Sequence, residues 1–106
     1  MKQFLRENGC WYVKYWGGGG YTRSGVPDLL ICCDGVFIAA EIKAGRGRPS
    51  ALQIREIHRI LDAGGLAVLV YPADLELFKA LIRAIRDGRD VRRIMAKLKE
   101  RMKKYE

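Results

Sequence analysis

Short apolar runs along the chain predict a set of β-strands. Residues 28–33 and 36–43 are two runs rich in β-forming residues, and the Asp34-Gly35 dipeptide between them is typical of a two-residue hairpin. A continuous apolar run at 66–71 predicts a buried strand, and the aromatic-rich residues 10–16 predict another. The sequence therefore predicts four strands, of which the second and third form a hairpin.

Apolar residues at helical spacing predict helices before, between and after these strands. The expected helices cover residues 2–8, 50–63, 74–85 and about 90–104. Asp74 and Asp90 are expected to cap the last two helices, and Gly64-Gly65 is expected to end the second. The element order is α-β-β-β-α-β-α-α, and the helix between the third and fourth strands predicts a right-handed crossover.

The hairpin turn also predicts which residues face each other. With the turn at 34 and 35, the numbers of opposed residues sum to 69, so Asp28 faces Glu41 and Lys43 lies on the same face. Both faces in the middle of the hairpin are apolar, which predicts a sheet covered on two sides. The four glycines Gly17–Gly20 predict either a mobile loop or a loop small enough for a phosphate backbone to approach.

Composition and charge limit the class of protein. The 106 residues suffice for one domain with one modest core, which excludes a large two-domain architecture, and 49% hydrophobic residues exclude disorder. The formal net charge is 20 − 12 = +8, which favours a polyanionic partner such as nucleic acid. Residues 1–82 contribute 10 − 8 = +2 of this charge and residues 83–106 contribute 10 − 4 = +6.

Two further patterns bear on cellular setting and on metals. The chain has neither a bilayer-length apolar run nor a secretory leader pattern, so we expect a cytoplasmic protein without a membrane partner. Three cysteines without zinc-ligand spacing predict no zinc site, and the adjacent Cys32 and Cys33 are expected to be reduced core residues.

The charged residues of the hairpin suggest chemistry. Carboxylates opposed across a hairpin lie about 5 Å apart at Cβ, where like charges destabilise each other. Either Lys43 or a divalent cation could neutralise Asp28 and Glu41, since carboxylate oxygens are hard ligands. An ordinary surface ion pair is the alternative explanation. The surrounding hairpin residues are apolar or small, which favours a functional cluster.

These motifs resemble those of a nuclease superfamily. Pro27-Asp28 followed by Glu41-Ile42-Lys43 on the next strand is similar to the PD-(D/E)xK core. More narrowly, residues 7–77 resemble the VRR-NUC (virus-type replication-repair nuclease) family. The motifs that carry this narrower resemblance are Gly25-Val26-Pro27-Asp28, Val36-Phe37-Ile38 before Glu41-Ile42-Lys43, Gly47 to Ser50-Ala-Leu-Gln53, and Ala63-Gly64-Gly65.

The resemblance implies a fold class. We expect an α/β protein with a restriction-endonuclease-like α-β-β-β-α-β core, in which helices flank a central mixed sheet, followed by C-terminal helices. The whole of residues 1–106 would be one nuclease domain, with the core at about 1–87 and a basic helix at about 90–105.

The resemblance also assigns roles to single residues. Asp28, Glu41 and the backbone carbonyl of Ile42 would bind Mg²⁺ or Mn²⁺, and Lys43 would position the attacking water or stabilise charge on the phosphate. Glu7 matches an acidic position of the superfamily and is a further candidate metal ligand.

Gln53 has two open interpretations. By the resemblance it is a catalytic residue beside the metal, whereas Ser50-x-x-Gln53 is also a capping box. The single histidine, His58, is expected to pack or to lie on the surface, which argues against histidine-pair mechanisms.

Basic and aromatic residues suggest a DNA-binding surface. Arg46 and Arg48 with two arginines of the following helix could form a phosphate track or a solvated face. The aromatic residues of 10–16 could stack on bases, pack in the core or form a dimer contact. The candidate DNA-binding residues are Lys14, Arg23, Arg46, Arg48, Arg55 and Arg59.

Together these features predict a metal-dependent structure-specific DNA endonuclease acting on branched DNA such as Holliday junctions. Each catalytic cluster cuts one strand, and the stripe Val91, Ile94, Leu98 and Met102 offers an apolar surface, so we expect a homodimer. The family name suggests a phage replication, repair or recombination setting. The alternatives are a non-catalytic nucleic-acid-binding module and a nuclease acting on flaps, single strands or RNA; membrane-surface binding by the terminal helix is disfavoured because it lacks Trp and Phe on its apolar side.

Overall fold

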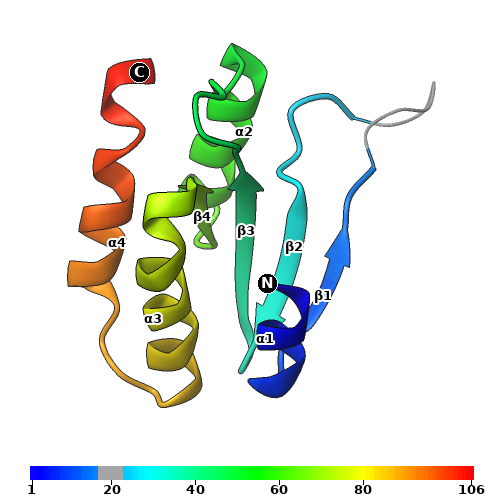
Figure 1. Cartoon of the computed structure of the whole chain (residues 1–106), viewed down its shortest axis with the longest axis vertical. Coiled ribbons are helices and arrows are strands. Elements are labelled where there is room, and N and C mark those ends of the chain that lie inside the picture. The colour runs from blue at the N-terminus through cyan, green and yellow to red at the C-terminus, as the bar shows by residue number, and fades with distance from the viewer. Residues whose placement is uncertain (17–22) are drawn as a thin grey trace.

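A four-stranded mixed sheet organises the chain, whose computed structural model describes residues 1–16 and 23–106 (Figure 1). The strands stand in the order β1-β2-β3-β4, and only the β3–β4 pairing is parallel. The strands are β1 (Trp11–Lys14), β2 (Leu29–Cys33), β3 (Val36–Ile42) and β4 (Leu66–Val70). The helices are α1 (Lys2–Glu7), α2 (Ala51–Asp62), α3 (Leu75–Arg86) and α4 (Arg92–Glu100), with 3₁₀ turns η1 (Pro72–Asp74) and η2 (Lys103–Tyr105). This arrangement confirms the α/β fold class with a mixed sheet flanked by helices. The predicted loop of four glycines at 17–20 lies outside the described residues.

The hairpin of β2 and β3 has the predicted register. Leu29 pairs with Ala40 and Cys33 pairs with Val36, so paired numbers sum to 69 as expected. Asp34 and Gly35 both have positive φ angles, 50° and 79°, which is the conformation of a type I′ turn. The turn chemistry therefore sets the pairing along the whole hairpin, up to the strand ends that carry the acidic residues.

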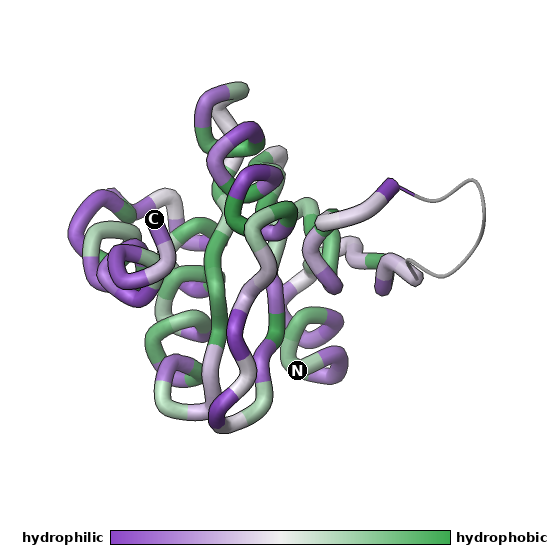
Figure 2. Tube along the Cα trace, turned by 90° about the horizontal axis from the view of Figure 1, so that it is seen from above, coloured by the Kyte–Doolittle hydropathy of each residue, from purple (hydrophilic) through white to green (hydrophobic). Residues whose placement is uncertain are grey.

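Helices cover the two faces of the sheet unequally. One core lies beneath α1 and α3, and a second, smaller core lies between α2 and the sheet, on the opposite face (Figure 2). Helix α4 packs beside α3 and β4. The extensive strand contacts of α2 are with β3 and β4, so this face of the sheet is left uncovered over β1 and at the ends of β2 and β3 next to the hairpin turn.

The uncovered part of the sheet corrects two sequence predictions. Trp11 is 63% exposed and Phe37 is 42% exposed, and Val13 and Cys32 are exposed between them. The hairpin is thus covered fully on one face and only partly on the other. Cys32 is not a core residue, because it points to this face, whereas its neighbour Cys33 is buried on the opposite one.

The C-terminal helices also differ from their predicted form. The Asp74 side chain makes no capping bond to α3; it is buried, accepts from the Tyr71 N–H at 3.1 Å and pairs with Arg101. Helix α4 is shorter than predicted, although Asp90 does accept a hydrogen bond from the Arg92 N–H. Its apolar stripe is buried within the chain, at Leu98 and Met102 above all. That stripe therefore cannot serve as the dimer surface for which it was proposed.

No helix within residues 1–16 and 23–106 has the length and apolar character needed to cross a membrane.

Candidate active site

Two hydrogen bonds and one close backbone approach fix the position of Asp28. Its carbonyl accepts a hydrogen bond from the Tyr15 N–H at 2.8 Å, which extends the β1–β2 pairing by one step. Its side-chain Oδ2 accepts from the N–H of Ile42 at 3.0 Å, across the hairpin. The preceding loop is held against α2 at Gly25, where a Cβ would lie 2.6 Å from the carbonyl oxygen of Leu52 and φ is +84°. Only glycine fits this close approach. The Gly25-Val26-Pro27-Asp28 segment is therefore held by α2 at its first residue and by the sheet at its last.

Glu41 is a buried carboxylate that lacks full hydrogen bonding. Its residue is 2% exposed, and among the described residues its Oε1 has no hydrogen-bond partner. Its Oε2 lies 3.4 Å from the Lys43 ammonium. Burial and, after it, the neighbouring Asp28 carboxylate raise the pKa of Glu41 to about 7, although the Lys43 ammonium opposes both effects. An unpartnered buried oxygen is costly to the fold, so its retention calls for a ligand or a proton.

Lys43 stands between Glu41 and Gln53. Its backbone N–H donates to the carbonyl of Val70 at 3.0 Å, which continues the parallel β3–β4 pairing, and its Nζ donates to Gln53 Oε1 at 3.0 Å. The same Gln53 oxygen accepts from the Ser50 N–H at 2.8 Å, while Ser50 Oγ accepts from the Gln53 N–H. Gln53 therefore caps α2 and accepts from Lys43 at once. The capping-box interpretation is confirmed, and the catalytic role of Gln53 stays a prediction.

The candidate DNA-binding residues have different surroundings. Arg23 and Arg59 both form ion pairs with Glu56, a buried acid of α2, so part of their charge is compensated inside the protein. The Lys14 ammonium lies 4.4 Å from the centroid of the Trp16 ring. Arg46, Arg48 and Arg55 are exposed, the first two in the loop directly after Lys43. The structure thus leaves the loop arginines freer for phosphate than the pair at Glu56.

Glu7 is not gathered with the acidic pair. It is exposed at the end of α1, where its Oε1 accepts from Gln3 at 3.0 Å. The chain passes from there into β1 at Trp11, which pairs with Cys32 next to the hairpin turn, whereas Asp28 lies beyond the other end of the β1–β2 ladder. Among the described residues no cluster of three or more acidic, histidine or cysteine side chains is present. The structure therefore gives Glu7 no place beside Asp28 and Glu41.

Comparison with protein families decides the relationship. The family model for archaeal Holliday junction resolvases (Hjc) matches residues 1–63, which is more than half of the chain and includes Asp28, Glu41, Lys43 and Gln53. The chain belongs to the archaeal Holliday junction resolvase family. Comparison with curated proteins gave no match.

Membership in the resolvase family confirms the broader part of the sequence prediction. The family is PD-(D/E)xK-like, and the observed mixed sheet agrees with its restriction-endonuclease-like fold. The narrower VRR-NUC assignment is not confirmed. Residues 64–106, which include α3, α4 and most of the positive charge, lie outside the match.

The resolvase-like site fits a hard divalent cation. Two carboxylates converge at the ends of paired strands, and one of them has a buried oxygen without a partner in the described part of the chain. Oxygen is the ligand atom that Mg²⁺ and Mn²⁺ prefer. Mg²⁺ commonly takes one or two carboxylates and fills its remaining positions with water and substrate phosphate. A third acidic side chain is therefore not required for the fit.

The sequence did not predict several polar contacts of this resolvase family member. Buried Glu56 joins two arginines, and Tyr71 and Tyr105 meet at 3.1 Å between their hydroxyls. His58, expected at the surface or in packing, lies 3.3 Å from a carboxylate oxygen of Glu106. Tyr71 and Tyr105 are 34 residues apart, and no local pattern indicates that contact. The position of Glu56 gave no signal either, because the apolar Ile54 two residues before it points to another side of the helix.

We predict that Glu41 destabilises the metal-free fold above neutral pH. The Glu41 carboxyl has a pKa of about 7 in the folded chain and 4.5 in the unfolded chain. The free energy of unfolding therefore falls as the pH rises from about 4.5 through 7. At roughly 1.4 kcal/mol for each pKa unit, Glu41→Gln should raise the free energy of unfolding at pH 8 by about 3 kcal/mol in EDTA. Urea denaturation at pH 4.5 and pH 8 measures this difference.

The control for this prediction is Glu76→Gln, which removes an exposed carboxylate on α3. It should leave the pH dependence of the parent unchanged. Equal pH dependence in the parent and in Glu41→Gln would show that Glu41 carries no burial penalty.

Proposed function

We propose that the chain is a divalent-metal-dependent, structure-specific DNA endonuclease that hydrolyses phosphodiester bonds in four-way junctions. The observation that carries the proposal is the acidic pair itself: Asp28 and Glu41 are held close together, although one buried oxygen of Glu41 has no hydrogen-bond partner within residues 1–16 and 23–106. Two carboxylates that lie this close, one of them buried, destabilise the fold, whereas their oxygens are suitable ligands for a divalent cation. Membership in a family of Holliday junction resolvases supports a branched substrate.

The chain's own residues divide the chemistry among them. Asp28, Glu41 and the Ile42 carbonyl would hold Mg²⁺ or Mn²⁺, which when bound lowers the pKa of water and offsets charge on the phosphate. Lys43 supplies a fixed ammonium, because Gln53 accepts from it at 3.0 Å and restricts its direction. That charge would stabilise the phosphate oxygens or orient the attacking water. Gln53 in turn is held by the N-terminus of α2 through Ser50.

DNA would approach along the basic residues next to the metal site. Arg46 and Arg48 lie three and five residues after Lys43, and Arg55 lies on the exposed side of α2. Phosphate contacts of this kind position a duplex without reading its sequence. We therefore expect selection of substrates by their shape, with Lys14, Arg23 and Arg59 as outlying contacts.

The experiment that tests this function is cleavage of a panel of DNAs with Mg²⁺. We expect the parent to cut a four-way junction faster than a flap, a single strand or a linear duplex. Asp28→Asn and Lys43→Gln should each slow cleavage at least about 10²-fold, because each removes a group that acts on developing charge. The matched control is Glu76→Gln, because Glu76 is an exposed acid on α3 and is not part of the acidic pair.

Each other outcome has a distinct meaning. Undiminished cleavage by Asp28→Asn would overturn the catalytic assignment. Equal cleavage of junction and single strand, or of RNA, would overturn the substrate assignment alone. Binding that is indifferent to EDTA and leaves every DNA intact would mark a nucleic-acid-binding module without catalysis.

The uncovered sheet face supports a homodimer by a different route from the one that the sequence suggested. We propose that Trp11, Val13, Cys32 and Phe37 form the dimer surface, named here the aromatic face. Exposed aromatic side chains are enriched at such interfaces, and one patch can pair with its own copy about a two-fold axis. A pocket of about 350 Å³ borders the face beside Phe37, between β2 and α2, and offers a recess for a partner's side chain.

Introducing a charge on the aromatic face should separate the dimer. We expect Phe37→Glu to elute as a monomer where the parent has twice that mass, by light scattering after gel filtration. Leu52→Glu is the control, because Leu52 is similarly exposed but belongs to α2 and is not one of the four residues of the face. A parent that is monomeric, or a Phe37→Glu variant that stays dimeric, would overturn the assignment of this surface.

A further inference from the structure

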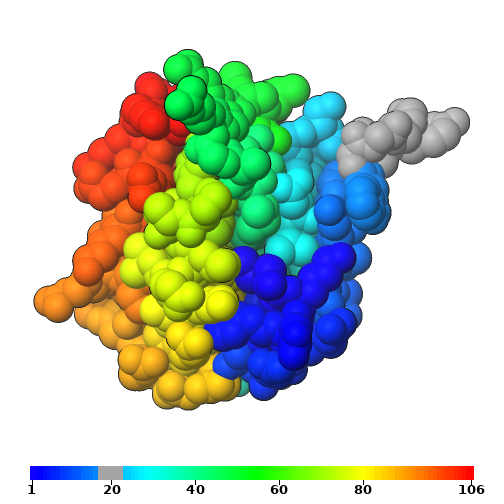
Figure 3. All heavy atoms as spheres, viewed as in Figure 1, coloured from blue at the N-terminus to red at the C-terminus, as the bar shows by residue number. Residues whose placement is uncertain are grey.

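A large pocket opens beside the candidate active site, and two of its three walls come from residues outside the range that the family model matches. Its volume is about 790 Å³, and its walls come from three separate parts of the chain. These are the loop at 45–48, the start of η1 at 71–73, and the C-terminal residues 100–105. In Figure 3 the C-terminal residues, in red, adjoin the green residues near that loop. The C-terminus thus reaches back to the edge of the sheet where the catalytic candidates lie.

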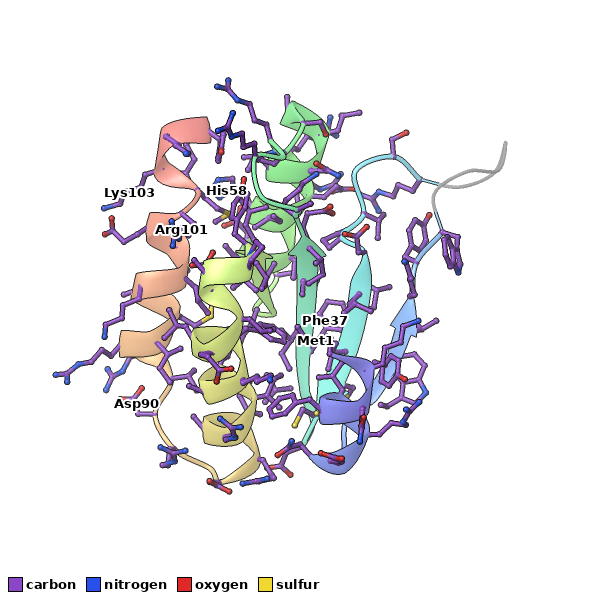
Figure 4. All side chains as sticks on the ribbon, in the orientation of Figure 1. Met1, Phe37, His58, Asp90, Arg101 and Lys103 are labelled. Carbon is purple, nitrogen blue, oxygen red and sulfur yellow. The ribbon has the colours of Figure 1, made fainter. Side chains whose placement is uncertain are left out.

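Hydrogen bonds between distant residues hold this pocket in shape. The Tyr71 hydroxyl donates to the Gly47 carbonyl at 2.8 Å and lies 3.1 Å from the Tyr105 hydroxyl. On the same wall, Arg101 Nε lies 2.7 Å from Oδ1 of buried Asp74. Figure 4 shows Arg101 and Lys103 at the C-terminal end of α4. The loop, η1 and the C-terminus are therefore joined by polar contacts, and the pocket is a built feature of the fold.

The pocket is strongly cationic. It is lined by five basic residues and a single acid, Glu100, which pairs with Lys103 at 2.9 Å. Arg101 pairs with Asp74. Within residues 1–16 and 23–106, the other three form no ion pair, which leaves uncompensated positive charge around the opening. The basic residues are Arg46, Arg48, Arg101, Lys103 and Lys104.

Its position relative to the acidic pair is set by the parallel strands. Ile42 pairs with Val70, and the pocket walls begin three residues after Ile42 on one strand and one residue after Val70 on the other. A strand advances about 3.3 Å per residue, while successive phosphates of one DNA strand are separated by about 3.4 Å of helix rise. The pocket therefore lies within a few nucleotides of a phosphodiester bound at Asp28 and Glu41.

We infer that this pocket, formed by the C-terminal segment and the basic loop, binds backbone phosphates of the DNA strand next to the bond that is cut. This inference rests on the proposed nuclease function, and it assigns a substrate subsite to residues 100–105. Lys104 and Lys103 supply charge from the C-terminus, opposite Arg46 and Arg48 of the loop. The Tyr71–Tyr105 contact keeps the two walls at a fixed separation. The C-terminal charge thus acts at one location in addition to raising general affinity.

A pair of charge-matched double variants separates a local site from general attraction. K103Q/K104Q removes two charges at the pocket, and K97Q/K99Q removes two exposed charges on α4 outside it. Both variants lower the net charge equally. Binding to a four-way junction is measured by fluorescence anisotropy with Ca²⁺ in place of Mg²⁺, over a range of salt concentrations. Melting temperatures check that both variants remain folded.

We expect K103Q/K104Q to weaken binding about tenfold or more, and to reduce the slope of log K against log salt by about 1 to 2, since each lost phosphate contact removes about 0.9. K97Q/K99Q should weaken binding less than about threefold and leave the slope within about 0.5 of the parent. Equal losses in the two variants would overturn the inference, because the charge would then act only in general.

Neutral phosphate analogues locate the contact on the DNA. A methylphosphonate placed at single positions of the cut strand should weaken binding by the parent at one or two positions near the cut. At those positions K103Q/K104Q should be indifferent to the replacement, whereas K97Q/K99Q should respond like the parent. The same position-dependent profile in the parent and in K103Q/K104Q would overturn the inference.

Failure of the subsite and failure of the nuclease proposal give different results. If the parent binds junctions and never cuts them, the nuclease proposal fails, and the anisotropy comparison still decides the subsite. If the parent cuts and the two double variants bind alike, only the subsite fails. If the parent binds no DNA, both fail together.

Discussion

The opposition of two carboxylates across one hairpin is the constraint on which the rest of the structure depends. Asp28 and Glu41 would repel each other if both were charged. Poor solvation of a buried charge and the nearby Asp28 carboxylate together raise the pKa of Glu41 to about 7. A fold selected for stability alone would place an apolar pair in this position. The surrounding contacts instead hold the carboxylates in place, through the Ile42 N–H on Asp28 and the Lys43 ammonium beside Glu41.

The wider fold supports this pair from both sides. The parallel β3–β4 pairing continues to Lys43, and the capping box of α2 gives Gln53 its hold on the lysine. Gly25 lets the loop before Asp28 rest directly on α2. The same helix has its main strand contacts with β3 and β4, and it leaves the aromatic face exposed over β1 and at the hairpin end of β2 and β3. One element thus positions the catalytic candidates and leaves free the surface proposed for a second subunit.

The sequence predicted features that depend on neighbouring residues, but it did not predict contacts between residues far apart in the chain. The Asp34-Gly35 turn predicted the register of the hairpin, because turn geometry and strand alternation fix the pairing without tertiary information. The α4 stripe predicted burial correctly but not its partner, since amphipathic helices look alike whether they pack on their own chain or on another. The contact of Tyr71 with Tyr105, and the burial of Asp74 beneath Arg101, depend on where α4 ends, and no nearby residue signals it.

Direct measurement of Mn²⁺ binding tests the central claim, that the Asp28–Glu41 pair exists to bind a cation. The free ion is followed by electron paramagnetic resonance as it is titrated into the protein without DNA. The account predicts that the parent and Glu76→Gln bind Mn²⁺ alike, and that Asp28→Asn and Glu41→Gln each lose at least about tenfold in affinity, as removal of a ligand requires. Binding of equal strength in all four proteins would contradict the account.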